Sequence, residues 1–210
     1  MTPIRCLLWD FGDTLCDETF IWSSGPEWME VYQTFDDGGL GAAWNLGEID
    51  TRGFASELAK RMGWSVDAIV AHMGERCHHI EFFPETYAFF QARHLPQAIV
   101  KVNPDLFSER IVPICQFETC CGAIVTSWEE GTTDKAVLCQ LAIERMGLSC
   151  KNSEALLIDN KQANLEDWAG RQGAGYLYST DAQFARDVSD GFDALAGAGI
   201  RPGAAPQTSR

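Results

Sequence analysis

Basic residues are scarce in this chain of 210 residues, which has 16 Lys and Arg against 30 Asp and Glu. The formal net charge of -14 at pH 7 argues against a protein that binds nucleic acid through its phosphates, because such binding needs a basic surface. The same charge disfavours an anionic membrane surface as a partner. A small phosphate ester remains possible as a ligand, since a metal ion and one lysine can neutralise it locally.

Long apolar runs are also missing. No stretch approaches the roughly 18 apolar residues of a membrane span, and residues 1–5 lead into a predicted strand without the apolar segment of a signal peptide. We therefore expect a soluble, cytoplasmic protein. The hydrophobic fraction of 46% is ordinary for a globular protein, and the length suits one domain with a sizeable insertion.

The chain lacks the spacing of a zinc site, although it has eight cysteines. No Cys-x-x-Cys occurs, and His72, His78 and His79 near Cys77 have no second ligand pair at zinc-like spacing. We expect buried or incidental thiols in a reducing compartment.

What the chain does have is an alternation of short apolar runs with helical patterns. The runs that predict strands are 4–9, 98–102, 121–126, 155–158 and 174–178. Helical patterns such as 135–146 and 162–172 separate them, which is typical of parallel strands joined by crossovers. The predicted fold class is therefore α/β, with a doubly wound, Rossmann-like parallel sheet of five strands.

The segment after the first strand has a different character. Its apolar residues follow helical spacing at 26–35, 49–62 and 65–73, and no part of it has a strand pattern. We predict an all-helical cap inserted after the first strand. The predicted division is a cap at 17–80, an α/β core at 1–16 and 81–199, and a disordered tail at 200–210.

Polar residues follow four of the predicted strands, where each strand ends. They are Asp10, Asn103, Ser127 and Asp159. The ligand crevice of a doubly wound sheet lies beyond the carboxyl ends of its strands. We therefore expect these residues to converge on one crevice, which the helical insert is placed to cover.

Two of these strand ends carry longer motifs. The hexapeptide Asp-Phe-Gly-Asp-Thr-Leu at 10–15 resembles the nucleophile loop Asp-x-Asp-Gly-Thr-Leu of the haloacid dehalogenase (HAD) superfamily. Residues 157–165, with Asp159, Asn160 and Asn164, are similar to the acidic motif of that superfamily. Residues 124–135 resemble the segment that carries its lysine. With the helical insert, the resemblance covers nearly the whole chain.

The resemblance implies a HAD-like hydrolase, with a Mg2+-dependent phosphatase as the leading function. An aspartate attacks phosphorus to give an aspartyl-phosphate, which water then hydrolyses. A Mg2+ ion and a lysine neutralise the anionic ester during the attack. The partner would be a small phosphate ester, with neither nucleic acid nor membrane involved. Substrate identity and oligomeric state are not predicted.

The resemblance also assigns roles to particular residues. Asp10 is the nucleophile, and Lys135 is the clamp on the phosphate, with Lys101 and Lys161 as competing clamps. Lys101, Asn103 and Ser127 are further candidates for binding the substrate. The implied metal ligands are Asp10, the carbonyl of Gly12, Asp159 and Asn160.

The chain departs from the superfamily pattern at several of these positions. Gly12 replaces the acid that protonates the leaving oxygen, and loss of general acid catalysis typically costs about 10²–10⁴-fold. Asp13 stands where glycine is usual; Asp tolerates left-handed backbone, and its carboxylate is a possible substitute acid. Val102 stands in place of a phosphate-binding hydroxyl. Asn160 replaces an acid and brings an uncharged oxygen ligand.

Two other functions therefore remain open. One is a catalytically impaired HAD-like protein that binds a ligand or a partner. The other is a haloacid dehalogenase-type hydrolase, in which the same nucleophile attacks carbon without a metal. No arginine near the start of the predicted cap is suited to bind a halide or carboxylate, which disfavours the second alternative.

Overall fold

The computed structural model describes residues 3–33 and 39–189. They form a five-stranded sheet in the order β3-β2-β1-β4-β5, and every neighbouring pair is parallel. The strands are β1 (Cys6–Trp9), β2 (Gln97–Lys101), β3 (Ala123–Thr126), β4 (Ala155–Asp159) and β5 (Ala174–Leu177). This confirms the predicted fold class. β1 lies at the centre of the sheet, so the residue that follows it is at the middle of the carboxyl edge.

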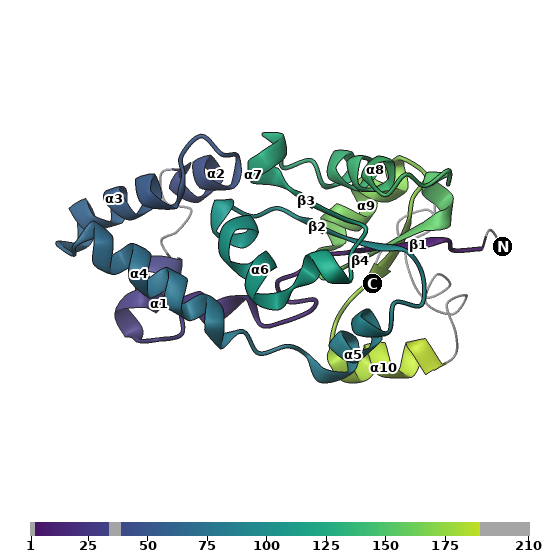
Figure 1. The fold of residues 1–210 in the computed structure, drawn as a ribbon, viewed down its shortest axis with the longest axis horizontal. Coiled ribbons are helices and arrows are strands. Elements are labelled where there is room, and N and C mark those ends of the chain that lie inside the picture. The colour runs from purple at the N-terminus through teal and green to yellow at the C-terminus, as the bar shows by residue number, and fades with distance from the viewer. Residues whose placement is uncertain (1–2, 34–38, 190–210) are drawn as a thin grey trace, which may run out of the picture.

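The strands are apolar on both faces because helices cover both. Helices α8 (Lys135–Arg145) and α9 (Gln162–Gly170) pack on one face, and α5 (Pro84–Ala92) and α10 (Asp181–Ser189) pack on the other (Figure 1). Trp9 illustrates the second face: its ring centroid lies 5.6 Å from that of Phe90 and 5.9 Å from that of Phe184. Burial of such large side chains on both faces fixes the sheet in the middle of the core.

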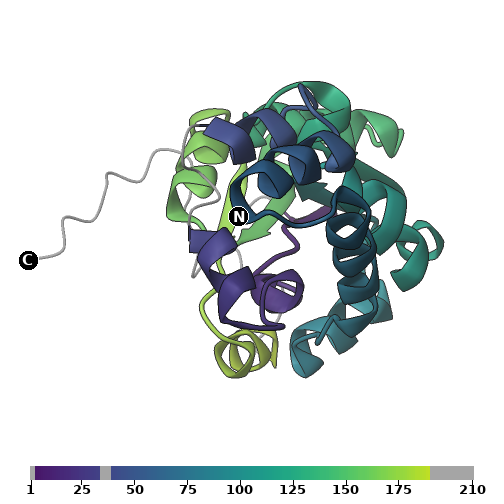
Figure 2. The ribbon, with the colours of Figure 1, turned by 90° about the vertical axis from the view of Figure 1, so that its left-hand side faces the viewer.

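The segment between β1 and β2 contains helices and, within the described residues, no strand. Before α5, which packs on the sheet, the α-helices of this segment are α1 (Pro26–Gln33), α2 (Leu40–Asn45), α3 (Thr51–Met62) and α4 (Val66–Arg76). They lie together beyond one end of the sheet, at the left of Figure 1 and nearest the viewer in Figure 2. This confirms a helical insertion after the first strand, while its treatment as a cap domain at 17–80 stays a proposal.

Helix boundaries follow local capping chemistry. Asp50 precedes α3 and accepts the N–H of Gly53 at 2.6 Å, and Gly63 ends the helix with φ at +69°. Asp134 likewise precedes α8 and accepts the N–H of Val137 at 3.0 Å. This second cap places Lys135 in the first turn of α8.

The insert is fastened to the core by one buried carboxylate. Asp105, in the segment after β2, accepts hydrogen bonds from the Trp44 indole at 2.8 Å, from the Thr51 N–H at 2.8 Å and from the Thr51 hydroxyl at 2.7 Å. Trp44 in turn stacks on Phe54, with ring centroids 4.1 Å apart. The insert is therefore held at the carboxyl edge of the sheet.

Several sequence predictions concern other parts of the chain. The predicted tail at 200–210 lies outside the described residues, as does the end of the first helix predicted in the insert.

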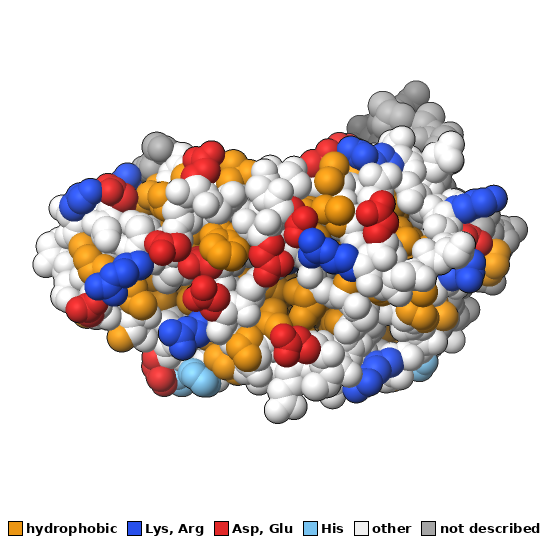
Figure 3. Space-filling model, turned by 45° about the horizontal axis from the view of Figure 1, so that its top comes forward, with side chains coloured by type: hydrophobic (Ala, Val, Ile, Leu, Met, Phe, Trp, Pro, Cys, Tyr) orange, Lys and Arg blue, Asp and Glu red, His pale blue; other side chains and the backbone are white. Residues whose placement is uncertain are grey.

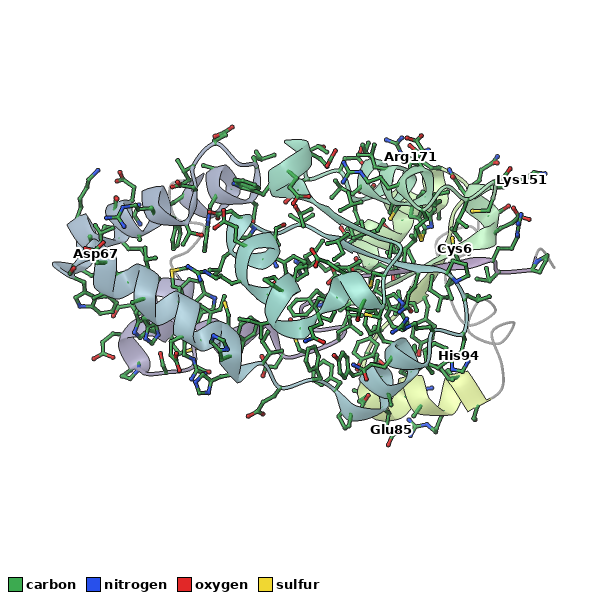
Figure 4. The ribbon with its side chains drawn as sticks, in the orientation of Figure 1. Cys6, Asp67, Glu85, His94, Lys151 and Arg171 are labelled. Atoms are coloured by element: carbon green, nitrogen blue, oxygen red, sulfur yellow. The ribbon has the colours of Figure 1, made fainter. Side chains whose placement is uncertain are left out.

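All eight cysteines are free. Cys6 lies towards the amino end of β1, far from Asp67 in the insert (Figure 4). On the face shown in Figure 3, Lys and Arg side chains are spread singly among acidic and uncharged ones. No helix among the described residues has the length and apolarity needed to cross a membrane.

Candidate active site

Asp10 is the first residue after the central strand. Its N–H donates to the carbonyl of Ile158 at 2.9 Å, which continues the pairing of β1 with β4 by one residue. Its side chain is buried, with Asp10 only 3% exposed. The sheet therefore presents one carboxylate at the middle of its carboxyl edge, as the sequence predicts.

The chain turns sharply after Asp10. The carbonyl of Phe11 accepts the N–H of Leu15 at 2.7 Å, and Asp13 adopts a left-handed backbone with φ at +55°. The Asp13 carboxylate accepts the backbone N–H of Glu18 at 3.0 Å. This bond uses Asp13 to hold the turn, so we do not pursue it as a substitute acid.

Lys135 joins the two strand-end carboxylates. Its Nζ lies 2.5 Å from Asp10 Oδ1 and 3.2 Å from Asp159 Oδ2, and it also donates to the Val100 carbonyl at 2.5 Å. Lys135 is only 1% exposed. Of the three lysines considered for the clamp, Lys135 is thus the one that contacts both Asp10 and Asp159.

A second buried lysine, Lys101, lies on the other oxygen of Asp10. It is the last residue of β2, and its Nζ lies 3.4 Å from Asp10 Oδ2 and 3.2 Å from Glu18 Oε1. β2 ends one residue earlier than the sequence predicts, and Lys101 is the strand-end residue that contacts Asp10. Asp10 therefore has an ammonium group on each carboxylate oxygen.

Glu18 is the site residue that the sequence did not reveal. It begins a 3-10 turn (Glu18–Ile21), and its side chain lies against Gly12: a Cβ added to Gly12 would be 2.7 Å from Glu18 Cδ. The only signal in the sequence was the missing side chain at position 12. Glu18 brings a carboxylate into the space that this glycine leaves open.

The charges of the site are set by these contacts. Burial acts to raise the pKa of Asp10, but Lys101 and Lys135 outweigh it and hold the pKa below its ordinary value. Burial acts to lower the pKa of each lysine, but Asp10 with Glu18 raises the pKa of Lys101, and Asp10 with Asp159 raises that of Lys135. At neutral pH Asp10 is therefore a carboxylate and both lysines are ammonium groups.

Asp159 ends β4 and is fully buried. Its Oδ1 accepts the backbone N–H of Lys161 at 2.8 Å, and the Asn164 amide donates to its Oδ1 at 3.1 Å and to its Oδ2 at 3.0 Å. Asn160 follows it, and its buried side-chain oxygen accepts no hydrogen bond within the described part of the chain. Both oxygens of Asp159 are thus occupied by N–H donors.

Ser127 and Asn103 hold the neighbouring strand ends together. The Ser127 hydroxyl accepts the N–H of Asn103 at 2.9 Å and lies 2.7 Å from the carbonyl of Asn45 in α2. Asn103 lines the cavity described next, whereas Ser127 is fully buried and is not among the lining residues. We therefore propose that Ser127 positions Asn103 and the insert, and that Asn103 is the better candidate for substrate contact.

A cavity of about 600 Å³ lies between the insert and the carboxyl edge of the sheet. The charged part of its lining consists of Asp10, Glu18, Lys101, Lys135 and Lys161. The aromatic part includes Phe20, Trp22 and Trp44 from the insert. Two buried tryptophans of the insert, Trp22 and Trp44, therefore also line a ligand-sized space.

Several solved structures have a similar fold. A HAD family enzyme from Bacteroides thetaiotaomicron, in complex with magnesium and inorganic phosphate, has a TM-score of 0.67 at 15% identity, covering 84% of this chain and 95% of its own. A predicted HAD-like family hydrolase from Porphyromonas gingivalis has a TM-score of 0.68 at 14% identity, covering 89% and 97%. L-2-haloacid dehalogenase from Xanthobacter autotrophicus, with chloropropionic acid covalently bound, has a TM-score of 0.63 at 13% identity, covering 94% and 89%.

The chain thus has the fold of the haloacid dehalogenase superfamily, as the motifs predicted. At these identities the comparisons establish the fold, and both phosphate-binding and dehalogenase proteins are among the similar structures. No family model and no curated protein matches the sequence.

Proposed function

We propose that this protein is a hydrolase that attacks a small anionic ester, with a phosphate monoester as the leading substrate class, through the carboxylate of Asp10. The observation that carries the proposal is the position of Asp10. It contacts Lys101 and Lys135 and lines a cavity of about 600 Å³, and the two lysines hold the pKa of its carboxyl group below its ordinary value. A positioned carboxylate beside two cations suits nucleophilic attack on an anionic centre.

The proposed reaction has two steps. An oxygen of Asp10 forms a bond to phosphorus while the bond from phosphorus to the leaving oxygen breaks, and the leaving alkoxide takes a proton from water, which gives an aspartyl-phosphate, an alcohol and hydroxide. Water then attacks the phosphorus while the bond from phosphorus to Asp10 breaks, which releases inorganic phosphate and restores the Asp10 carboxylate, and the proton that this water gives up neutralises the hydroxide. Lys101 and Lys135 offset the negative charge that gathers on the phosphoryl oxygens, and Asn103 and Lys161 are placed to orient the substrate.

Mg2+ was expected as cofactor, with Asp10, Gly12, Asp159 and Asn160 as ligands, and the two carboxylates among these residues do not fit it. Mg2+ needs an octahedral shell of oxygens at about 2.1 Å. Both oxygens of Asp10 face ammonium groups, and both oxygens of Asp159 accept N–H donors. Among the described residues no cluster of three His, Cys, Asp or Glu could hold a metal ion.

Electrostatics points the same way. A divalent ion about 4 Å from the Lys101 ammonium would be repelled by about 8 kcal/mol at an effective dielectric constant of about 20, which cancels the attraction of one carboxylate at the same distance. We therefore route no step through Mg2+. The cavity lining and Asp159 together contain three carboxylates and three ammonium groups, so their formal charges cancel and an anionic substrate meets no net negative charge.

The aromatic wall narrows the substrate class. Phe20, Trp22 and Trp44 line the same cavity as the charged residues. A substrate with an anionic head towards Asp10 and an apolar or aromatic part towards the insert would use both walls. We expect aryl or otherwise apolar monoesters to be hydrolysed faster than small polar ones.

Attack on carbon is the second candidate. It is favoured by Gly12, which supplies no acid for a leaving oxygen, because a halide leaving group needs no proton. The likeness to a dehalogenase with chloropropionic acid covalently bound is consistent with it. It is weakened by the cavity lining, in which none of the described residues is an arginine.

A substrate panel tests these proposals. Wild type and Asp10→Asn are assayed with phosphate monoesters and with 2-haloacids, with and without EDTA, while phosphate or halide release is followed. Phosphate release that Asp10→Asn abolishes supports the leading proposal, and halide release supports the second. If wild type turns over neither class, the catalytically impaired alternative, a protein that binds a ligand or partner, replaces both.

A further inference from the structure

Lys101, Glu18 and Gly12 form a set that the proposed reaction alone does not explain. Lys101 Nζ lies between Asp10 Oδ2 at 3.4 Å and Glu18 Oε1 at 3.2 Å. Lys101 is 3% exposed, so its charge is not shared with bulk water. A buried ammonium group between two carboxylates occupies the kind of position in which proteins bind a divalent cation.

We propose that Lys101, held by Glu18, is a built-in cation of this site and makes it independent of divalent metal. The ammonium group neutralises the oxygen of Asp10 that Lys135 does not contact. A metal ion on Asp10 Oδ2 would have to displace Lys101, and Lys101 would then lose both of its carboxylate partners.

Gly12 is the residue that permits this arrangement. Any side chain there would begin 2.7 Å from Glu18 Cδ and 2.8 Å from Glu18 Oε1. The Glu18 carboxyl group would then have to shift away from Gly12, which disturbs its contact with Lys101. Gly12 therefore leaves room for the Glu18 side chain, and Glu18 in turn holds Lys101 at the end of β2.

The kinetic consequence of this inference rests on the proposed function, but the inference itself concerns cation binding and is testable without a substrate. Mn2+ is the probe, since its binding is measured directly by electron paramagnetic resonance. Purified full-length protein is freed of metal with EDTA and titrated with Mn2+ at about neutral pH. The variants are Lys101→Met and, as the matched control, Lys151→Met, an exposed lysine at the far end of the molecule (Figure 4).

Wild type and Lys151→Met are expected to bind no Mn2+ at the site even at millimolar concentration. Lys101→Met leaves Asp10 and Glu18 without their shared cation, so it is expected to gain a single Mn2+ site at least about tenfold tighter than any in wild type. Loss of that gain in Lys101→Met/Asp10→Asn would assign the new site to Asp10. Lys101→Gln provides a second test if Lys101→Met does not give a folded protein by circular dichroism.

Two results would overturn the inference. One is tight Mn2+ binding by wild type that Asp10→Asn removes, and the other is a folded Lys101 variant that binds Mn2+ no better than wild type. Neither result depends on turnover. If wild type turns over no substrate of the panel but Lys101→Met gains Mn2+ binding, only the proposed function is rejected. If wild type hydrolyses a phosphate monoester but Lys101→Met gains no Mn2+ binding, only the built-in cation is rejected.

Discussion

Lys135 offers the sharpest link between the geometry of the site and the stability of the fold. Its ammonium group is buried and contacts Asp10 at 2.5 Å and Asp159 at 3.2 Å. Lys135→Met keeps the length and volume of the side chain but removes the charge. Two buried carboxylates then lose a partner, although Asp10 keeps Lys101 and Asp159 keeps the N–H donors of Lys161 and Asn164.

Removing one member of a buried ion pair typically destabilises a protein by about 3–5 kcal/mol. Because both carboxylates keep other partners, we expect a value near the lower limit, about 3 kcal/mol. The assay is urea denaturation near neutral pH, compared with wild type and with the exposed control Lys151→Met, for which we expect a change below about 0.5 kcal/mol. A change under about 1 kcal/mol in Lys135→Met would refute the reasoning, because an exposed pair accounts for that much.

Two of the remaining predictions concern stability in urea, and the third concerns turnover. Asp10 has a lowered pKa in the folded protein, so its contribution to stability is present above the unfolded carboxyl pKa of about 4 and is lost as pH falls through the folded value. The difference in free energy of unfolding in urea between wild type and Asp10→Asn should therefore shrink between pH 5 and 2. A difference that stays constant over this range would contradict the prediction. Asp105→Ala removes the acceptor of three hydrogen bonds to the insert and should lower the free energy of unfolding by about 2–4 kcal/mol. The control Asp67→Ala, on the exposed end of the insert, should lower it by less than about 1 kcal/mol. Equal losses of stability in the two variants would mean that Asp105 does not fasten the insert. Gly12→Ala displaces Glu18 from Lys101 and should lower kcat/KM about tenfold, since a hydrogen bond to a charged group contributes about 1.5 kcal/mol or more. In the double variant, the effect of Gly12→Ala should not add to that of Glu18→Gln. Full activity of Gly12→Ala would exclude the role given to Gly12.

The sheet could be predicted because each strand is an apolar run buried on both faces. Such a run needs no knowledge of its neighbours to be recognised. Asp10 and Lys135 were proposed from the superfamily resemblance, and the structure brings their side chains into contact. Local pattern was therefore enough for the fold class, while the roles given to these two residues stay proposals.

The features that the sequence did not reveal depend on contacts between distant segments. Glu18 matters only because a turn folds it over Gly12, and Asp105 only because its carboxylate reaches Trp44 and Thr51. Helix α2 has six residues and starts after Gly39, so its apolar pattern is too short to recognise. The role of Lys101 was obscured by a one-residue error in the end of β2.

One measurement tests the central claim, that Asp10 is a nucleophile that works without a divalent metal. A single turnover of a phosphate monoester is run in 18O-labelled water with excess enzyme and EDTA, and the label in the released phosphate and in the peptide with Asp10 is read by mass spectrometry. An aspartyl-phosphate hydrolysed at phosphorus predicts one labelled oxygen in phosphate, none in Asp10, and a trapped hydroxamate at Asp10 when hydroxylamine is added. Turnover that requires Mg2+, or hydroxylamine trapping that is absent in wild type, would contradict the account.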